Sequence, residues 1–214
     1  TMVLKREPSP LSYGVVLLDS EGRVCRFVEK PSWSEVTANT VNTGIYILEP
    51  EILDYIPSER AMDFGKELFP ELLRRGVPMY GYITEDYWCD IGDSSAYFNA
   101  HTAFLSGNLK LETPAHDYGN GIFLEEDASV QDIELLNGPV YIGRHSRIES
   151  GSRIGAYSVI GENCHIENAE LQGSILWDNC VVKPGGILRQ AIICDNVILR
   201  QNARICERAV IGRG

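Results

Sequence analysis

Long apolar runs and positive charge are both scarce in this sequence. No stretch approaches the roughly 20 apolar residues of a membrane-spanning helix, and the first residues lack a basic and apolar leader. Only 19 lysines and arginines stand against 30 aspartates and glutamates, so the formal net charge is −11. This balance excludes the broad basic surface of a nucleic-acid-binding protein, although one lysine and a metal ion can attract a small anion locally. We expect a cytoplasmic protein that binds neither a membrane nor nucleic acid.

Cysteine and histidine are few and scattered. The 6 cysteines include no CxxC pair, and the 4 histidines show no metal-ligand spacing. Such a pattern is typical of reduced, buried thiols rather than of a disulfide framework or a zinc site.

The first half of the chain alternates strand and helix signals. Short β-branched and apolar runs predict strands over 1–6, 13–19, 23–29, 42–48 and 79–83, with a hairpin turn at 19–22. Apolar residues at helical spacing predict helices over 50–56, 63–76 and 94–105. Asp63 can cap the second of these helices and Gly76 can end it. The first region is therefore α/β, and we place it at residues 1–111.

A period of six residues replaces this alternation after about residue 120. The aliphatic positions are Leu124, Val130, Leu136, Ile142, Ile148, Ile154, Ile160 and Ile166, then Ile175, Val181, Ile187, Ile193, Leu199, Ile205 and Ile211. Small residues such as Ser146, Ser152 and Ala191 follow four positions later, where a flat face would turn a corner. Neither a helix nor an open sheet has this period. Residues 112–214 are therefore predicted to form a left-handed parallel β-helix of about five coils, with a loop between Ile166 and Ile175.

Polar residues at strand ends of the first region are candidates for a phosphate and sugar site. Lys30 follows a strand and precedes Pro31, and a lysine held there suits contact with a phosphate monoester. Glu29 could accept hydrogen bonds from sugar hydroxyls. Taken alone, Lys30 also fits a solvated surface residue, and Glu29 fits an ion pair with Arg23 or Arg26.

Small and polar residues on two other strands suit the same ligand. Asn42 and Thr43 begin an otherwise apolar strand, where they could face a ligand, and Gly44 would let that ligand approach the backbone. Gly14 could serve in the same way against a hexose ring. Thr43 and its neighbours also fit a simple turn into a strand.

Asp90 is the candidate metal ligand. It lies in a loop just before the helix-start residues Asp93, Ser94 and Ser95, and a carboxylate there suits Mg²⁺, which is often held by one or two carboxylates and substrate phosphates. Asp93 fits the alternative role of helix cap better. Tyr13 and Trp88 are expected to be packing residues.

Three short motifs give the chain a family resemblance. Phe27–Pro31 (FVEKP), Val41–Tyr46 (VNTGIY) and Tyr87–Gly92 (YWCDIG) resemble, in order and spacing, signatures of the sugar-phosphate nucleotidyltransferases, and Tyr13–Val16 resembles a fourth. The nearest subgroup is the GDP-mannose pyrophosphorylases. The resemblance covers nearly the whole chain once the repeats are included, and it assigns the metal-ligand role to Asp90.

The resemblance implies a Rossmann-like domain that joins a nucleoside triphosphate to a sugar 1-phosphate with Mg²⁺, most simply GTP to mannose 1-phosphate. The family's glycine-rich phosphate loop has no counterpart before residue 107. We therefore expect a fragment that holds the sugar-phosphate half of the domain and is inactive alone.

Other functions stay open at this point. Glucose 1-phosphate with dTTP, UTP or ATP would use the same residues. The β-helix could join subunits into a homo-oligomer or serve a non-catalytic regulatory subunit. Acyl transfer through His145 or His165 is a further alternative, although no acyl-CoA loop accompanies these histidines.

Overall fold

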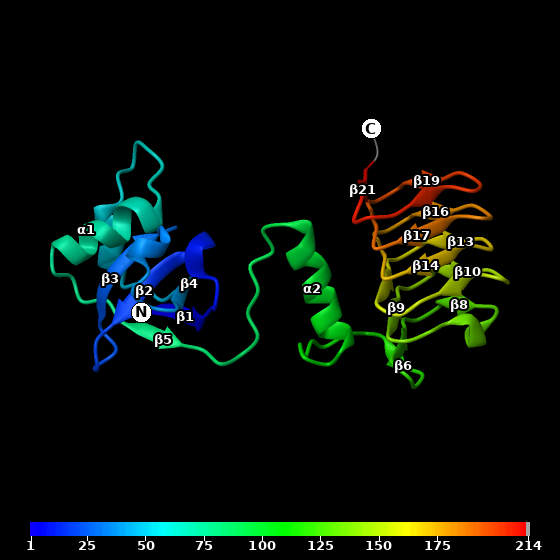
Figure 1. Ribbon diagram of the computed structural model, residues 1–214, viewed down its shortest axis with the longest axis horizontal. Helices are drawn as coiled ribbons and strands as arrows, with labels where there is room; N and C mark the ends of the chain where they lie inside the picture. Colours follow the sequence, from blue (N-terminus) through cyan, green and yellow to red (C-terminus); the bar gives the residue numbers. More distant parts are fainter. Residues whose placement is uncertain (213–214) are drawn as a thin grey trace. The chain divides into compact units, whose positions relative to one another are not determined.

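The computed structural model describes residues 1–212, which form two compact units (Figure 1). The first unit comprises Thr1–Asp90, and the second begins at Ile91. No helix in the described part of the chain has the length and apolar character of a membrane span.

A five-stranded sheet forms the centre of the first unit, in the order β3-β2-β4-β1-β5. The strands are β1 (Met2–Arg6), β2 (Gly14–Leu18), β3 (Val24–Glu29), β4 (Thr40–Tyr46) and β5 (Gly81–Ile83). β5 pairs parallel to β1, and the other pairings are antiparallel. Asp19 closes the β2–β3 hairpin, because its carboxylate accepts hydrogen bonds from the backbone of Glu21 and Arg23. The predicted strands and hairpin are thus confirmed.

Short helices complete this unit: η1 (Pro10–Ser12), η2 (Trp33–Glu35), η3 (Pro50–Tyr55), η4 (Phe64–Leu68) and α1 (Phe69–Arg74). Leu68, Phe69 and Leu72 pack on one side of the sheet with Leu4, Val16 and Phe27 in a common core.

The single helix predicted over 63–76 is interrupted. Asp63 does cap it, because its Oδ1 accepts a hydrogen bond from the backbone N–H of Lys66 at 2.8 Å. Gly76 ends it with a φ of 72°. Pro70 has no N–H to continue the α-helical ladder, and the preceding turn, η4, is a π-helix in which Phe69 N–H donates to Phe64 O.

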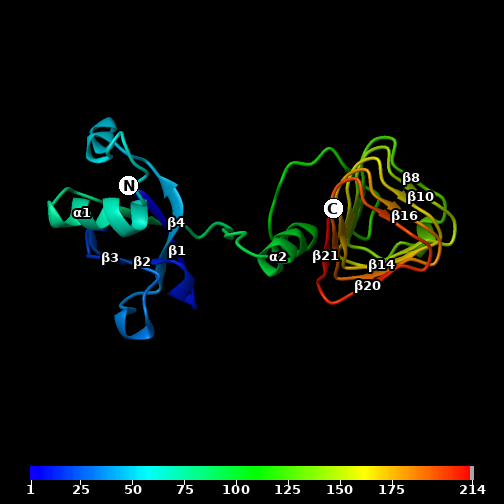
Figure 2. The same ribbon diagram turned by 90° about the horizontal axis from the view of Figure 1, so that it is seen from above.

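Three sheets form the faces of a parallel β-helix in the second unit, and Figure 2 shows their strands stacked around a common interior. The first face contains β8 (Ser129–Val130), β10 (Arg147–Ile148), β13 (His165–Ile166), β16 (Val181–Val182) and β19 (Ile198–Leu199). The second contains β11 (Arg153–Ile154), β14 (Glu170–Gln172), β17 (Ile187–Arg189) and β20 (Arg204–Ile205). The third contains β7 (Ile122–Leu124), β9 (Val140–Ile142), β12 (Ser158–Ile160), β15 (Ile175–Leu176), β18 (Ile192–Ile193) and β21 (Val210–Ile211), with β6 (His116–Asp117) antiparallel at its edge. A 3-10 turn, η5 (Ile133–Leu135), follows β8.

The six-residue period fills the interior as predicted over most of the β-helix. The predicted positions from Leu124 to Ile166 lie in the core, and Ser146, Ser152, Ser158, Cys164 and Ala191 are buried at corners. Asn163, Asn179, Asn196 and Asn202 have positive φ at the turns, a conformation that asparagine tolerates better than most residues.

The prediction fails between Ile166 and Ile193. Leu171 is buried and aligned with the interior residue Ile154, so the predicted three-residue loop is wrong. The steps from Ile166 to Leu171 and from Leu171 to Leu176 are five residues instead of six, which shifts the interior register. Leu176, Val182 and Leu188 therefore point inward in place of their predicted neighbours, Ile175, Val181 and Ile187.

The helix predicted over 94–105 is α2 (Ser94–Leu105), and it packs against the outer side of the third face. Trp177 Nε1 donates to Tyr97 Oη at 3.0 Å, and the Phe104 ring lies 6.3 Å from Phe123 and 6.1 Å from Tyr141. α2 therefore belongs to the second compact unit.

Candidate functional site

The carboxylate of Glu29 lies in a slot that two glycines leave open. Gly14, at the start of β2, pairs with Glu29 at the end of β3. A Cβ on Gly14 would lie 2.7 Å from Glu29 Oε2, and a Cβ on Gly65 in η4 would lie 2.6 Å from the same oxygen. Both distances are too short for real contacts, so any larger residue would displace the carboxylate. No ion pair joins Glu29 to Arg23 or Arg26 within the described residues.

Tyr46 and Gly44 fix the side chain of Asn42 on the neighbouring part of β4. Asn42 Nδ2 donates to Tyr46 Oη at 2.7 Å, and its Oδ1 accepts from the backbone of Gly44 at 3.2 Å. Burial raises the pKa of Tyr46; the Asn42 amide opposes the rise, and the negative charges of Glu29 and Asp63 add to it. Asn42 and Tyr46 therefore form a hydrogen-bonded pair whose phenol feels the negative charge of Glu29.

Thr43 and Gly44 have mainly backbone roles. Thr43 Oγ1 donates to Val3 O at 2.8 Å, which ties β4 to β1 where their register shifts. Gly44 has a φ of 83°, and a Cβ there would meet nothing within 4 Å. The left-handed conformation, rather than a crowded neighbour, thus explains the glycine.

Lys30 lies immediately after β3 with an exposed side chain. Its φ is 46°, and its N–H donates to Tyr13 O at 3.0 Å, so the backbone turns away from the sheet at this residue. Among the described residues, no carboxylate forms an ion pair with its ammonium group. Lys30 is therefore a cation available at the Glu29 end of the sheet.

Asp90 lies in the irregular segment after β5, with its side chain exposed. The Trp88 ring packs edge-on against Tyr13 at 5.5 Å, which holds this segment to the strand end beside Gly14 and supports the predicted packing role of both aromatics. Asp93 Oδ1 accepts a hydrogen bond from the backbone N–H of Ala96 at 2.7 Å. Asp93 therefore caps α2, the role that the sequence favoured for it.

The donor set around Asp90 is compatible with Mg²⁺ but not with a metal cage made by protein alone. Within residues 1–212 no three His, Cys, Asp or Glu side chains come together to hold a metal. Mg²⁺ is commonly bound through one or two carboxylates and substrate phosphates, and a single exposed carboxylate fits such a donor set.

Sequence reasoning missed two members of the site, Tyr46 and Gly65. Tyr46 was included in a strand motif without a role, and Gly65 was hidden inside a predicted helix. A glycine lowers the helical propensity at its position, but only the structure shows that the Glu29 carboxylate lies against Gly65.

Comparisons with known proteins give the family of each part of the chain. The family described as "Nucleotidyl transferase" matches residues 1–107, and the "EIF2B subunit epsilon LbH domain" matches residues 119–214. The chain therefore belongs to the nucleotidyl transferase family, and it carries a left-handed β-helix domain of hexapeptide repeats.

Individual relatives differ in the sugar nucleotide that their names specify. A UTP–glucose-1-phosphate uridylyltransferase of Synechocystis is 37% identical over 199 residues, covering 90% of this chain and 51% of the relative. A glucose-1-phosphate adenylyltransferase of Desulfitobacterium hafniense is 28% identical over 219 residues, covering 92% and 50%. A probable mannose-1-phosphate guanylyltransferase of Arabidopsis thaliana is 30% identical over 205 residues, covering 92% and 55%. The chain thus spans about half the length of these relatives.

Proposed function

We propose that this chain supplies the sugar 1-phosphate side of a nucleotidyltransferase that transfers a nucleotidyl group to a sugar 1-phosphate and releases pyrophosphate. The observation that carries the proposal is the slot formed by Gly14 and Gly65, which holds the Glu29 carboxylate one residue along the chain from the exposed cation of Lys30. A carboxylate that suits hydroxyl groups, followed by a cation that suits a phosphate, matches the two ends of a sugar 1-phosphate.

Each side chain has a distinct role in this proposal. Glu29 accepts hydrogen bonds from the sugar hydroxyls, and Asn42 donates one to them through the second N–H of Nδ2. Tyr46 keeps the Asn42 amide in one orientation. Lys30 binds the phosphate that attacks the α-phosphorus of the nucleotide. Gly14 keeps the end of β2 open to the sugar, Gly44 gives β4 its left-handed turn, and Thr43 fixes β4 against β1.

Asp90 would hold Mg²⁺, which neutralises phosphate charge when bound. The reaction involves no covalent intermediate on these residues, because the nucleophile is an oxygen of the sugar phosphate itself. The contribution of the chain is therefore positioning and charge neutralisation.

Two substrate pairs have support. The 37% identity to a uridylyltransferase favours UTP with glucose 1-phosphate. The motif resemblance and the Arabidopsis relative favour GTP with mannose 1-phosphate. We place the first pair ahead of the second because the identity is higher over nearly the whole chain.

A pyrophosphate-release assay on the full-length protein tests both the activity and the pair. We expect Mg²⁺-dependent release with one sugar 1-phosphate and one nucleoside triphosphate from a grid of glucose and mannose 1-phosphates against UTP, GTP, ATP and dTTP. The 214-residue chain is the control and is expected to be inactive. No pyrophosphate release by the full-length protein with any of these pairs would refute the proposal.

A further inference from the structure

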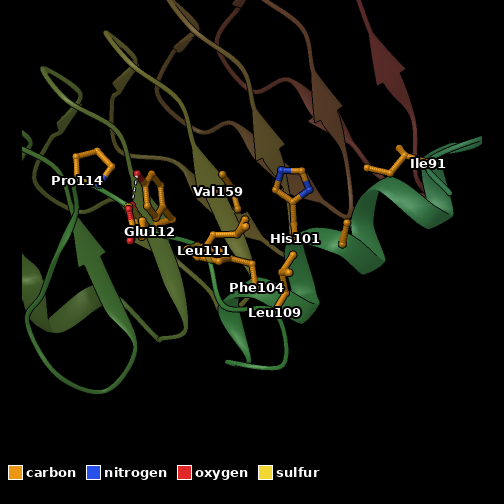
Figure 3. A pocket seen from close by; sticks show the side chains of 11 residues that line it. Ile91, His101, Phe104, Leu109, Leu111, Glu112, Pro114 and Val159 are labelled. Atoms are coloured by element: carbon orange, nitrogen blue, oxygen red, sulfur yellow. Dashed lines mark hydrogen bonds between the residues drawn. The ribbon is translucent and has the colours of Figure 1, made fainter. Parts of the chain in front are cut away.

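An apolar pocket lies within the second unit, between α2, the segment after it and the outer side of the β-helix (Figure 3). Its volume is about 440 Å³, which is within the usual range for small-molecule sites of roughly 300–1,000 Å³. Phe104 and Ala100 of α2 form one wall, Leu109 and Leu111 form another, and Val159 lies on the β-helix side. The catalytic proposal uses none of these residues.

The two hydroxyl groups of the lining, on Tyr141 and Thr113, are already hydrogen-bonded to each other. Tyr141 Oη donates its hydrogen bond to Glu125. Thr113 Oγ1 lies 2.9 Å from Tyr141 Oη, and because the Tyr141 proton is already used, Thr113 is the donor in this second hydrogen bond. Burial, followed by the hydrogen bond to Glu125, raises the pKa of Tyr141 to about 12. Neither hydroxyl proton is available to a ligand.

The remaining polar side chains of the lining are His101 and Glu112. His101 Nδ1 lies 2.8 Å from the carbonyl oxygen of Tyr97 and must donate its proton to that oxygen, so Nε2 is the ring atom that can accept a hydrogen bond from a ligand. Glu112, exposed beside Leu111, adds a carboxylate. An apolar pocket with two acceptors and a negative rim favours a ligand with a donor and disfavours anions.

We propose that this pocket binds a small organic molecule with an aromatic or branched aliphatic body and one amino or hydroxyl donor, which bonds to His101 Nε2. Its ligand would thus differ in charge from sugar phosphates and nucleotides, all of which are anions. The pocket would be a second binding site, separate from the nucleotidyl-transfer chemistry.

Three indole compounds that share a ring and differ in their side-chain charge test this assignment: tryptamine, tryptophol and indole-3-acetate. In isothermal titration calorimetry with the 214-residue chain, tryptamine and tryptophol should bind one site saturably. Indole-3-acetate should bind at least about tenfold more weakly, because Glu112 repels it.

Two variants show where the compounds bind. Ala100→Phe fills the pocket from α2 and should abolish binding, and His101→Phe keeps a ring but removes the acceptor and should weaken tryptophol binding roughly tenfold. Thermal unfolding of both variants checks that they are folded.

Three results would overturn the proposal: no saturable binding of any compound, unchanged binding in Ala100→Phe, or equal binding of indole-3-acetate. Self-association of the chain that Ala100→Phe removes, measured by sedimentation velocity, would instead assign the pocket to a second copy and would also overturn it.

Discussion

Replacing Gly65 by alanine should displace the Glu29 carboxylate without unfolding the protein. The new Cβ would lie 2.6 Å from Glu29 Oε2, and ordinary contact begins at 3.4 Å, so the carboxylate must move by about 0.8 Å. Gly65 does not have a positive φ, so the substitution introduces no backbone strain. A shift of this size breaks a hydrogen bond to a charged group, which typically contributes about 1.5–3 kcal/mol.

The expected consequence is a loss of roughly 10- to 150-fold in kcat/KM for the sugar 1-phosphate. The assay is steady-state pyrophosphate release by the full-length protein with the sugar 1-phosphate varied. KM for the nucleoside triphosphate should stay near the wild-type value, because Glu29 is assigned to the sugar.

Gly212→Ala is the matched control, because a Cβ there meets nothing within 4 Å and the residue does not have a positive φ. It should retain wild-type kinetics. A Gly65→Ala enzyme with unchanged kcat/KM and a normal unfolding temperature would refute the role of the slot, whereas equal losses for both substrates would refute the assignment of Glu29 to the sugar.

The remaining predictions concern Asn42, the β-helix core and acid stability. Tyr46→Phe removes the partner of Asn42 Nδ2 and should raise KM for the sugar 1-phosphate roughly tenfold; an unchanged KM would show that Tyr46 does not position Asn42. Ile160→Ala, in the interior, should lower the free energy of unfolding by about 2–5 kcal/mol in denaturant titrations, whereas Ile198→Ala, 66% exposed, should change it by less than about 0.5 kcal/mol. Hydrogen bonds from Arg74 and then Arg75 lower the pKa of Glu71 from 4.5 to about 2, so its stabilising effect is present above about pH 4.5 and is lost as the pH falls toward 2. The difference in unfolding temperature between wild type and Glu71→Gln should therefore shrink over that interval, and a constant difference would contradict the assignment.

The fold was predictable where the signal was local. Asp19 and its turn marked the β2–β3 hairpin, and the capping residues Asp63 and Asp93 marked two helix starts. The interior register failed after Ile166 because β15, β16 and β17 each have aliphatic residues at two successive positions. Ile175 and Leu176 are both buried, so a period alone could not tell which of them points inward.

The site was predictable only in part, because its members meet across long sequence separations. Glu29, Lys30 and Asn42 are polar residues at strand ends, which a single sequence can reveal. The contact between Gly65 and Glu29 joins a π-helical turn to a strand end 36 residues earlier, and no local pattern encodes it. The Tyr46–Asn42 bond likewise depends on the bulge at Gly44 between them.

The most direct test of the central claim is the effect of Lys30→Ala on the two Michaelis constants of the full-length enzyme. If Lys30 binds the phosphate of the sugar 1-phosphate, KM for that substrate should rise by at least about tenfold while KM for the nucleoside triphosphate stays the same. Lys66→Ala, at another exposed lysine, serves as the control and should change neither constant. A rise confined to the nucleoside triphosphate, or no change in either constant, would contradict the assignment of this chain to the sugar-phosphate side.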